Sequence, residues 1–428
     1  MLKRLLLDMR IRRLILFASV LVLTAVGSGT SVAARESSGT PAARTALDRG
    51  EAAVRTGELD AAVAAFRKAI AVDPGFVDAH QRLIEITQRQ QLQDPEGARL
   101  SRLQRQYERW ARRQPKRAVY QVALGLLAKE PEQAAAYYNK ALALDPAFAR
   151  AHFLLARIAD NAGDWDAQRQ HLKAAVESNR DEPRYLLRYA VAHEKSGPAR
   201  FRELALQVVA AFPTSPSAAE ALYILANAST NPERRGYLDR LRASYPVDRF
   251  PYAASAMNVL YADLTEPSEA LALARDMVRV LPAATVWPPR VAAQDAMLRA
   301  KTLIDGGQFK EALALLDTTA KPSGNHGTTW TLLKADAAAG IGNRAHAYET
   351  LIESAAASPD GRVDAALAKY TTALAKTNRD VDADVWNARD AHARPAAPFT
   401  LSSLRDGAPV RLADFRGRVV LLAFWYPT

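Results

Sequence analysis

Cysteine is absent from this chain of 428 residues. Structural disulfides are therefore excluded, and the fold must be held together by packing alone. A bacterial lipoprotein anchor is excluded as well, because that modification requires a cysteine at the cleavage site.

Three catalytic signatures are also missing: the His-Glu-x-x-His zinc motif, the glycine-rich phosphate-binding loop and the Gly-x-Ser-x-Gly nucleophile elbow. The histidines do not have the spacing of metal ligands. There are seven of them: His80, His152, His171, His193, His326, His346 and His392. We therefore expect no catalytic residue, no cofactor-binding residue, no cofactor and no metal ligand in this chain.

Glycine and proline are sparse within long segments, β-branched runs are few, and alanine dominates. This composition favours helix. The formal charge is +11, of which residues 1–34 contribute +4, so the remainder carries +7. Such a small surplus, spread over so long a chain, does not indicate a nucleic-acid partner.

The first 34 residues have the three parts of a secretory signal peptide. Basic residues crowd the start, a thirteen-residue apolar run spans Leu14–Val26, and small residues follow up to Ala34. The pattern predicts cleavage near Ala34 and a periplasmic or secreted protein. Residues 35–45, rich in serine, glycine and proline, are expected to form a flexible leader. The alternative is an uncleaved inner-membrane anchor formed by residues 14–34.

Residues 46–74 have the spacing of a helical hairpin. Two helices approach closely only where one of them presents Ala or Gly, and an aromatic ring fills the space beside that small residue. A proline then ends the second helix. The residues that fit this scheme are Gly50, Gly57, Ala62, Phe66, Ala69 and Pro74.

The hairpin pattern recurs along the chain. Ala62, Phe66, Ala69 and Pro74 are separated by four, three and five residues, and Ala134, Tyr138, Ala141 and Pro146 have the same spacing. A third unit combines a first helix and turn with a second helix, through His152, Leu155, Ala156, Ala159, Gly163, Leu172 and Ala175. This pattern resembles the tetratricopeptide repeat (TPR).

Beyond the third unit, only the turn and end signals of the repeat persist. Prolines are expected to follow second helices, and glycines to mark turns within hairpins, at Pro213, Pro246, Pro282, Pro322, Gly197, Gly306 and Gly342. We predict about nine helix pairs in an α-solenoid over residues 46–394. The resemblance implies a concave face that holds a peptide or a partner protein.

One predicted helix, over Gly97–Lys116, has an unusual polar face. It carries a stripe of basic residues at steps of three and four, opposite an apolar stripe. The two stripes are Arg99, Arg102, Arg105, Arg109, Arg112, Arg113 and Lys116, and Leu100, Leu103, Tyr107 and Trp110. The basic stripe is interpreted either as a solvated outer surface or as a docking face for an acidic partner or an anionic lipid.

Four tryptophans stand alone in the sequence. They are Trp165, Trp287, Trp330 and Trp386. We expect each of them to pack between repeats rather than to form part of an aromatic cage.

The last segment, residues 395–428, has a different character. Asp406-Gly407 predicts a turn between two short strands, and the apolar run Val419–Trp425 predicts a strand buried on both sides. The order of Phe399, Asp406-Gly407, Asp414-Phe415-Arg416-Gly417 and this run resembles the start of a redoxin-type thioredoxin-like domain. In that family a Cys-x-x-Cys motif follows shortly after the position matched by Trp425, so the resemblance implies a redox motif beginning just after Thr428.

The predicted fold class is thus an all-α, TPR-like solenoid of helix hairpins, followed by an incomplete β segment of a thioredoxin-like α/β domain. Two functions are compatible with it. In the first, the chain is an exported scaffold that binds a protein or peptide. In the second, the full gene product is a thiol or selenol disulfide oxidoreductase, to which the solenoid recruits substrates.

Overall fold

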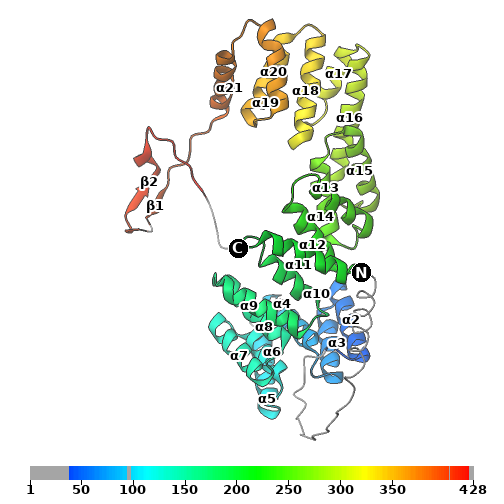
Figure 1. Cartoon of the computed structure of the whole chain (residues 1–428), viewed down its shortest axis with the longest axis vertical. Coiled ribbons are helices and arrows are strands. Elements are labelled where there is room, and N and C mark those ends of the chain that lie inside the picture. The colour runs from blue at the N-terminus through cyan, green and yellow to red at the C-terminus, as the bar shows by residue number, and fades with distance from the viewer. Residues whose placement is uncertain (1–37, 94–97, 404, 424–428) are drawn as a thin grey trace, which may run out of the picture. The chain divides into compact units, whose positions relative to one another are not determined.

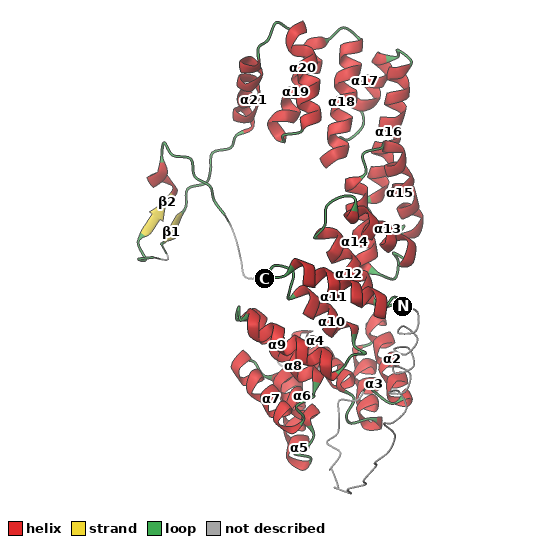
Figure 2. Cartoon of the chain, viewed as in Figure 1, coloured by secondary structure: helices red, strands yellow, loops and turns green. Residues whose placement is uncertain are grey.

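The computed structural model describes residues 38–93, 98–403 and 405–423 (Figure 1). These residues form twenty α-helices, a 3-10 helix and two short strands (Figure 2). The predicted all-α architecture is confirmed, and the twenty helices of the described residues are two more than nine pairs would supply. None of the helices in these ranges is both long and apolar enough to span a bilayer. The predicted signal peptide lies outside the described residues.

The chain divides into two compact units, residues 1–221 and 222–428. In the first unit, successive helices pair as hairpins joined by short turns, and α12 (Pro216–Asn227) crosses the division. The helices of this unit are α2 (Pro41–Thr56), α3 (Leu59–Val72), α4 (Val77–Gln93), α5 (Arg99–Arg113), α6 (Ala118–Leu127), α7 (Pro131–Leu144), α8 (Ala149–Asn161), α9 (Trp165–Ser178), α10 (Pro183–Val191) and α11 (Pro198–Ala211).

The first helix begins earlier than the sequence predicts. α2 begins at Pro41, and the Thr40 hydroxyl accepts a hydrogen bond from the Ala43 amide at 3.3 Å. Threonine before proline is a favourable helix start, since the threonine caps the helix and proline has no N–H to satisfy at the first position. Ala43 is fully buried. The predicted leader is therefore too long, because its last residues belong to the first hairpin.

Four turns inside hairpins share one construction in the described residues. Each has a glycine whose φ lies between 73° and 86°, a conformation that costs glycine little: Gly57, Gly163, Gly307 and Gly342. In the first of them, Gly57 N–H donates to Val54 O at 3.2 Å and Glu58 N–H donates to Ala53 O at 2.8 Å. This pair of bonds is a Schellman motif, which satisfies carbonyls at the end of the first helix and reverses the chain.

The predicted helix ends and turns of the later repeats are also confirmed. Each predicted proline follows a second helix, as Pro213 follows α11. Gly197 caps the start of α11, and Gly342 lies in a turn. At the predicted turn glycine Gly306 the helix ends, and the next residue, Gly307, takes the left-handed conformation.

The small and aromatic positions of the first two repeats pack as the sequence predicts. Ala62, Phe66 and Ala69 are fully buried, and a Cβ placed on Gly50 would lie 2.3 Å from Phe66 Cε1. In the next such hairpin, a Cβ on Gly125 would lie 2.3 Å from Tyr138 Cε1. Glycine on the first helix therefore admits the ring of the second helix, and no larger residue fits without a shift.

The second unit continues the succession of helices. Its helices are α13 (Glu233–Ser244), α14 (Pro251–Asp263), α15 (Pro267–Val280), α16 (Trp287–Asp305), α17 (Phe309–Asp317), α18 (Gly324–Gly340), α19 (Arg344–Ala357), α20 (Gly361–Ala373) and α21 (Asn378–His392). Helix α18 takes part in two separate apolar clusters. Trp330 and Ala337 pack with residues of α16 and α17, whereas Ala335 and Ala338 pack with residues of α19–α21.

The tryptophan prediction is half right. Trp287 and Trp330 are buried and pack between helices as expected. Trp165 and Trp386 are 55% and 61% exposed, so the packing role predicted for them is wrong. Trp165 is the first residue of α9, and Trp386 lies on α21, the last α-helix of the described residues, over which no later helix packs.

The C-terminal segment forms part of what its sequence predicts. β1 (Thr400–Ser402) and β2 (Pro409–Arg411) pair antiparallel with Leu401 opposite Val410, and Gly407 has a φ of 71° in the turn. The 3-10 helix η1 (Leu412–Phe415) follows.

The predicted strand over Val419–Trp425 is not formed in its described part, residues 419–423. These residues pair with no strand, and Val419 and Leu421 are exposed. A strand without a neighbour leaves its backbone groups unpaired, so apolar character alone does not make one. Trp425 lies outside the described residues.

Candidate functional site

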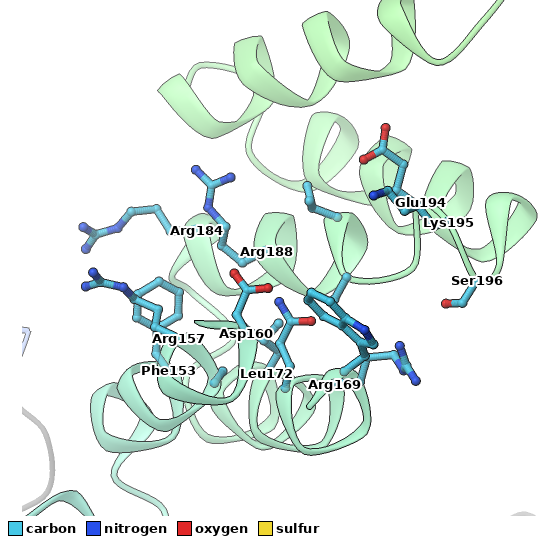
Figure 3. Close-up of a pocket in the computed structure, with 15 residues that line it drawn as sticks. Phe153, Arg157, Asp160, Arg169, Leu172, Arg184, Arg188, Glu194, Lys195 and Ser196 are labelled. Carbon is cyan, nitrogen blue, oxygen red and sulfur yellow. The ribbon is translucent and has the colours of Figure 1, made fainter. Parts of the chain in front are cut away.

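The first unit contains a pocket of about 850 Å³ formed by α8, α9 and α10 and the residues after α10 (Figure 3). Its lining comes from the first helices of two successive hairpins and from the second helix between them. The lining residues are Phe153, Ala156, Arg157, Asp160, Trp165, Gln168, Arg169, Leu172, Arg184, Arg188, Val191, Ala192, Glu194, Lys195 and Ser196.

The apolar part of this α8–α10 pocket combines buried and exposed side chains. Ala156 and Leu172 are buried. Phe153 packs on Tyr185 with ring centroids 5.1 Å apart, which holds its ring in place. Trp165, at the start of α9, contributes a large ring that is more than half exposed. A water-exposed indole in a hollow surface is available for contact with another molecule.

Three arginines of the pocket are already held by carboxylates. Arg184 pairs with Glu182 at 2.8 Å, Arg188 pairs with Glu220 at 2.8 Å, and Arg169 pairs with Asp166. Burial acts to raise the pKa of Glu182, but the hydrogen bonds and charge of Arg184, together with the charge of Arg150, outweigh it and lower that pKa. These pairs fix the guanidinium groups at the pocket wall and leave some of their N–H donors available.

Four further charges of the pocket make no ion pair with another described residue. Two are positive, Arg157 and Lys195, and two are negative, Asp160 and Glu194. Figure 3 shows Arg157 and Asp160 near Arg184 and Arg188 at one end, and Glu194 and Lys195 at the other. The pocket therefore offers both donors and acceptors around an apolar centre.

Two histidines, one on each helix of the α8–α9 hairpin, form a pair that the sequence did not reveal. His152 Nδ1 lies 3.2 Å from His171 Nδ1, and His152 Nε2 lies 3.0 Å from the Pro146 carbonyl. The carbonyl can only accept, so His152 carries its proton on Nε2, and His171 donates to its Nδ1. Burial, and then the neighbouring His152, lower the pKa of His171. No third ligand completes a metal site: the residues that the structure describes hold no group of three such side chains.

His80 is a buried structural residue. Its Nε2 lies 3.1 Å from the Pro74 carbonyl and its Nδ1 2.8 Å from Tyr107 Oη, so the ring donates to the carbonyl and accepts from the tyrosine. Trp110 and Tyr120 complete a cluster of rings around it. Burial lowers the pKa of His80 to about 4, which keeps the ring neutral. This cluster fastens α5 to the repeat.

A second hollow, of about 550 Å³, lies between α3 and α5 over the end of α4. We call it the basic groove. Its lining consists of Asp60, Val63, Ala64, Arg67, Thr87, Gln90, Arg99, Arg102, Leu103, Arg105, Gln106 and Arg109. Only the first part of the predicted basic stripe lines it, and Arg112, Arg113 and Lys116 lie outside. Arg67, from α3, was missed because it is distant in sequence from α5.

The sequence comparisons agree with the hairpin architecture. Two family models, each described as a tetratricopeptide repeat, match residues 32–102 and 126–190. A comparison with curated proteins gave no match.

Solved structures of similar proteins carry the same kind of repeat. A thermophilic TPR protein of Thermus thermophilus is 19% identical over 42% of this chain and 99% of its own, with a TM-score of 0.31. YrrB, described as a TPR protein with an unusual peptide-binding site, is 17% identical over 42% of this chain and 91% of its own, with a TM-score of 0.26. A TPR protein of Parabacteroides merdae is 12% identical over 77% of this chain and 98% of its own, with a TM-score of 0.28.

The matched segment 32–102 covers the α2–α3 hairpin, in which Gly50 admits the ring of Phe66. The matched segment 126–190 covers α7, whose Tyr138 is buried, and the α8–α9 hairpin. The chain therefore contains tetratricopeptide repeats, which form helix hairpins in its first unit.

Proposed function

We propose that this chain is a scaffold that binds an extended segment of a partner protein in the α8–α10 pocket. The observation that carries the proposal is the exposed ring of Trp165 beside Phe153 and Leu172, within a hollow lined by charges of both signs. Tryptophan is enriched among residues that dominate binding energy, and it loses little conformational freedom on binding.

The chemistry of the pocket defines the ligand class. An apolar side chain of the ligand would cover Trp165 and Phe153. Asp160 and Glu194 would accept backbone N–H groups, and the fixed Arg184 and Arg188 would donate to carbonyls or to a carboxylate. We therefore expect a peptide with one apolar anchor flanked by polar or charged residues.

Selection of binders from a displayed library of random peptides, with the full chain as the target, tests this proposal. Peptides that bind through the pocket should lose about ten-fold or more in affinity for Trp165→Ala, since such anchor residues contribute upward of 1 kcal/mol. Trp386→Ala is the matched control, because that ring on α21 is similarly exposed but is not part of the pocket lining. Selected peptides that bind Trp165→Ala as well as they bind the wild type would contradict it.

We further propose that residues 1–34 export the protein to the periplasm or the cell exterior. The basic start, the apolar run and the small residues before Arg35 support this. N-terminal sequencing of the mature protein should begin near Ala34 or Arg35. A protein that retains Met1 and stays in the cytosol would contradict export, whereas retention of Met1 at the inner membrane would favour the anchor.

A thiol- or selenol-dependent oxidoreductase is the second candidate function. It rests on the resemblance of residues 398–425 to the start of a redoxin domain, and the β1–β2 hairpin with its Gly407 turn is compatible with that start. The coding sequence after codon 428 tests it. A cysteine codon, or an in-frame UGA, that opens a Cys-x-x-Cys-like motif and a thioredoxin-like reading frame would support this function. A downstream sequence without such a frame would contradict it.

A further inference from the structure

The basic groove between α3 and α5 is a site separate from the α8–α10 pocket. We propose that it binds an acidic polypeptide segment, in which aspartate or glutamate residues alternate along an extended backbone. The inference does not depend on the proposed peptide pocket, since the two hollows share no residue.

Four of the five arginines that line the groove are not paired with a carboxylate of the described residues. Arg67, Arg102, Arg105 and Arg109 are exposed, and none of them makes an ion pair with a carboxylate in the part of the chain that the structure describes. Asp60 is the one acidic residue in the lining, and its Oδ1 already accepts a hydrogen bond from Gln90 Nε2 at 2.8 Å. A guanidinium group presents a planar fork of donors that matches a carboxylate in two parallel bonds.

The arginines of α5 lie on a helix that is held in place by packing. Tyr107 is fully buried on the opposite face of α5 and donates a hydrogen bond to His80, which holds that face in the repeat, and Leu103 of the lining is buried as well. Arg102 and Arg109 are seven positions apart, which at 1.5 Å per residue is about 10 Å along the helix. Successive arginines on α5, Arg102, Arg105 and Arg109, are thus about 4.5–6 Å apart along the helix, and alternate residues of an extended chain are about 6.6 Å apart. The long arginine side chains can take up this difference, so carboxylates on alternate ligand residues can meet successive arginines, and Arg67 of α3 also lines the groove.

A lipid surface fits this site less well than a polypeptide does. The exposed residues of α5 are all polar or charged, because its apolar side chains face the repeat. No apolar face is left on this helix to enter a bilayer, and interfacial helices depend on such a face. The arginines also line a hollow, which a planar headgroup layer cannot fill.

Single-stranded nucleic acid is disfavoured for a different reason. Proteins that bind it stack the bases on aromatic side chains. No aromatic residue lines the basic groove. The lining supplies guanidinium groups, amides and aliphatic carbon, which suit a carboxylate-bearing backbone.

Fluorescence anisotropy on the full chain tests the proposal, with a labelled peptide of alternating glutamate and serine as the probe. The test variant is Arg102→Glu with Arg105→Glu. The matched control is Arg112→Glu with Arg113→Glu, which makes the same charge change on the same helix outside the groove. The test variant should lose about ten-fold or more in affinity, and the control less than about three-fold, since the affinity lost with a charge pair depends on contact.

The other outcomes are equally informative. Equal losses in both variants would show attraction to overall charge and would overturn a specific groove. Binding of phosphatidylglycerol vesicles or of oligothymidine that depends on Arg102 and Arg105, without peptide binding, would overturn the choice of ligand.

Conversion of Arg102, Arg105 and Arg109 to lysine keeps the charge and the fold. It should weaken peptide binding if the paired hydrogen bonds matter, and unchanged affinity would overturn the bidentate arrangement. Trp165→Ala should leave the probe's affinity unchanged, which separates this site from the α8–α10 pocket.

Discussion

The contact between Gly50 and Phe66 leads to a prediction about the sign of a mutational effect. Alanine is a better helix former than glycine by about 1 kcal/mol, so Gly→Ala in an open helix position stabilises. At Gly50 the new Cβ would lie 2.3 Å from Phe66 Cε1, far inside van der Waals contact. Phe66 is fully buried, so its ring has no free direction in which to move.

The two effects can be weighed against each other. Overpacking a filled core costs typically about 1–3 kcal/mol, and a contact this short belongs at or above the upper part of that range. After the gain in helix propensity is subtracted, Gly50→Ala should destabilise the first unit by roughly 1–2 kcal/mol. Gly236, on α13, is the matched control, because a Cβ there meets nothing within 4 Å. Gly236→Ala should stabilise by roughly 0.5–1 kcal/mol.

Urea denaturation followed by circular dichroism at 222 nm measures both variants. Because each repeat contacts mainly its neighbours, Gly50→Ala should shift the transition of the first unit and leave the second unit unchanged. Shortening the ring with Phe66→Leu should make Gly50→Ala less harmful than it is in the wild-type background. If Gly50→Ala stabilised the protein as Gly236→Ala does, the ring would be free to shift and the packing argument would be wrong.

Three further predictions follow from buried groups and from the C-terminal segment. An unfolded histidine gains a proton near pH 6.5, whereas buried His80 gains one only near pH 4. Stability is therefore complete above pH 6.5 and should fall by roughly 3 kcal/mol between pH 6.5 and 4, and His80→Gln should flatten this slope in pH-dependent urea titrations. Arg150 is almost fully buried and pairs with Asp78, so Asp78→Asn should cost roughly 1–3 kcal/mol, and adding Arg150→Met should recover part of it; an additive double variant would contradict the pairing. Deleting the residues after Arg394 removes the exposed Val419 and Leu421, so it should improve solubility without changing the helical signal, and loss of most of that signal would show that the tail packs into the helices.

The repeat positions could be predicted from sequence because their physics is local. A small residue and an aromatic residue a few positions apart set one helix against its hairpin partner, as at Ala62 and Phe66. Turn glycines and terminal prolines act on their own backbone, so they mark boundaries even where the aromatic pattern has faded.

The candidate sites could not be predicted in the same way, because they depend on how hairpins stack. Arg67 joins Arg102 only through the packing of α3, α4 and α5. His152 and His171 meet across a hairpin, and neither shows a motif in sequence. Trp165 was expected to pack between repeats because tryptophan is apolar, but at the first position of α9 it lines a pocket and stays more than half exposed.

The two contacts of helix α18 bear on how the second unit unfolds. Its Ala335 and Ala338 belong to the cluster with α19–α21, while Trp330 and Ala337 belong to the cluster with α16 and α17. If α19–α21 unfolded, α18 would still be packed against α16 and α17. Local unfolding that starts at α21 should therefore stop at α18. The last three helices should therefore exchange their amide hydrogens as one cooperative group, at a lower opening free energy than α16–α18. The side chains that build two cores on one helix thus also set the border between two folding units.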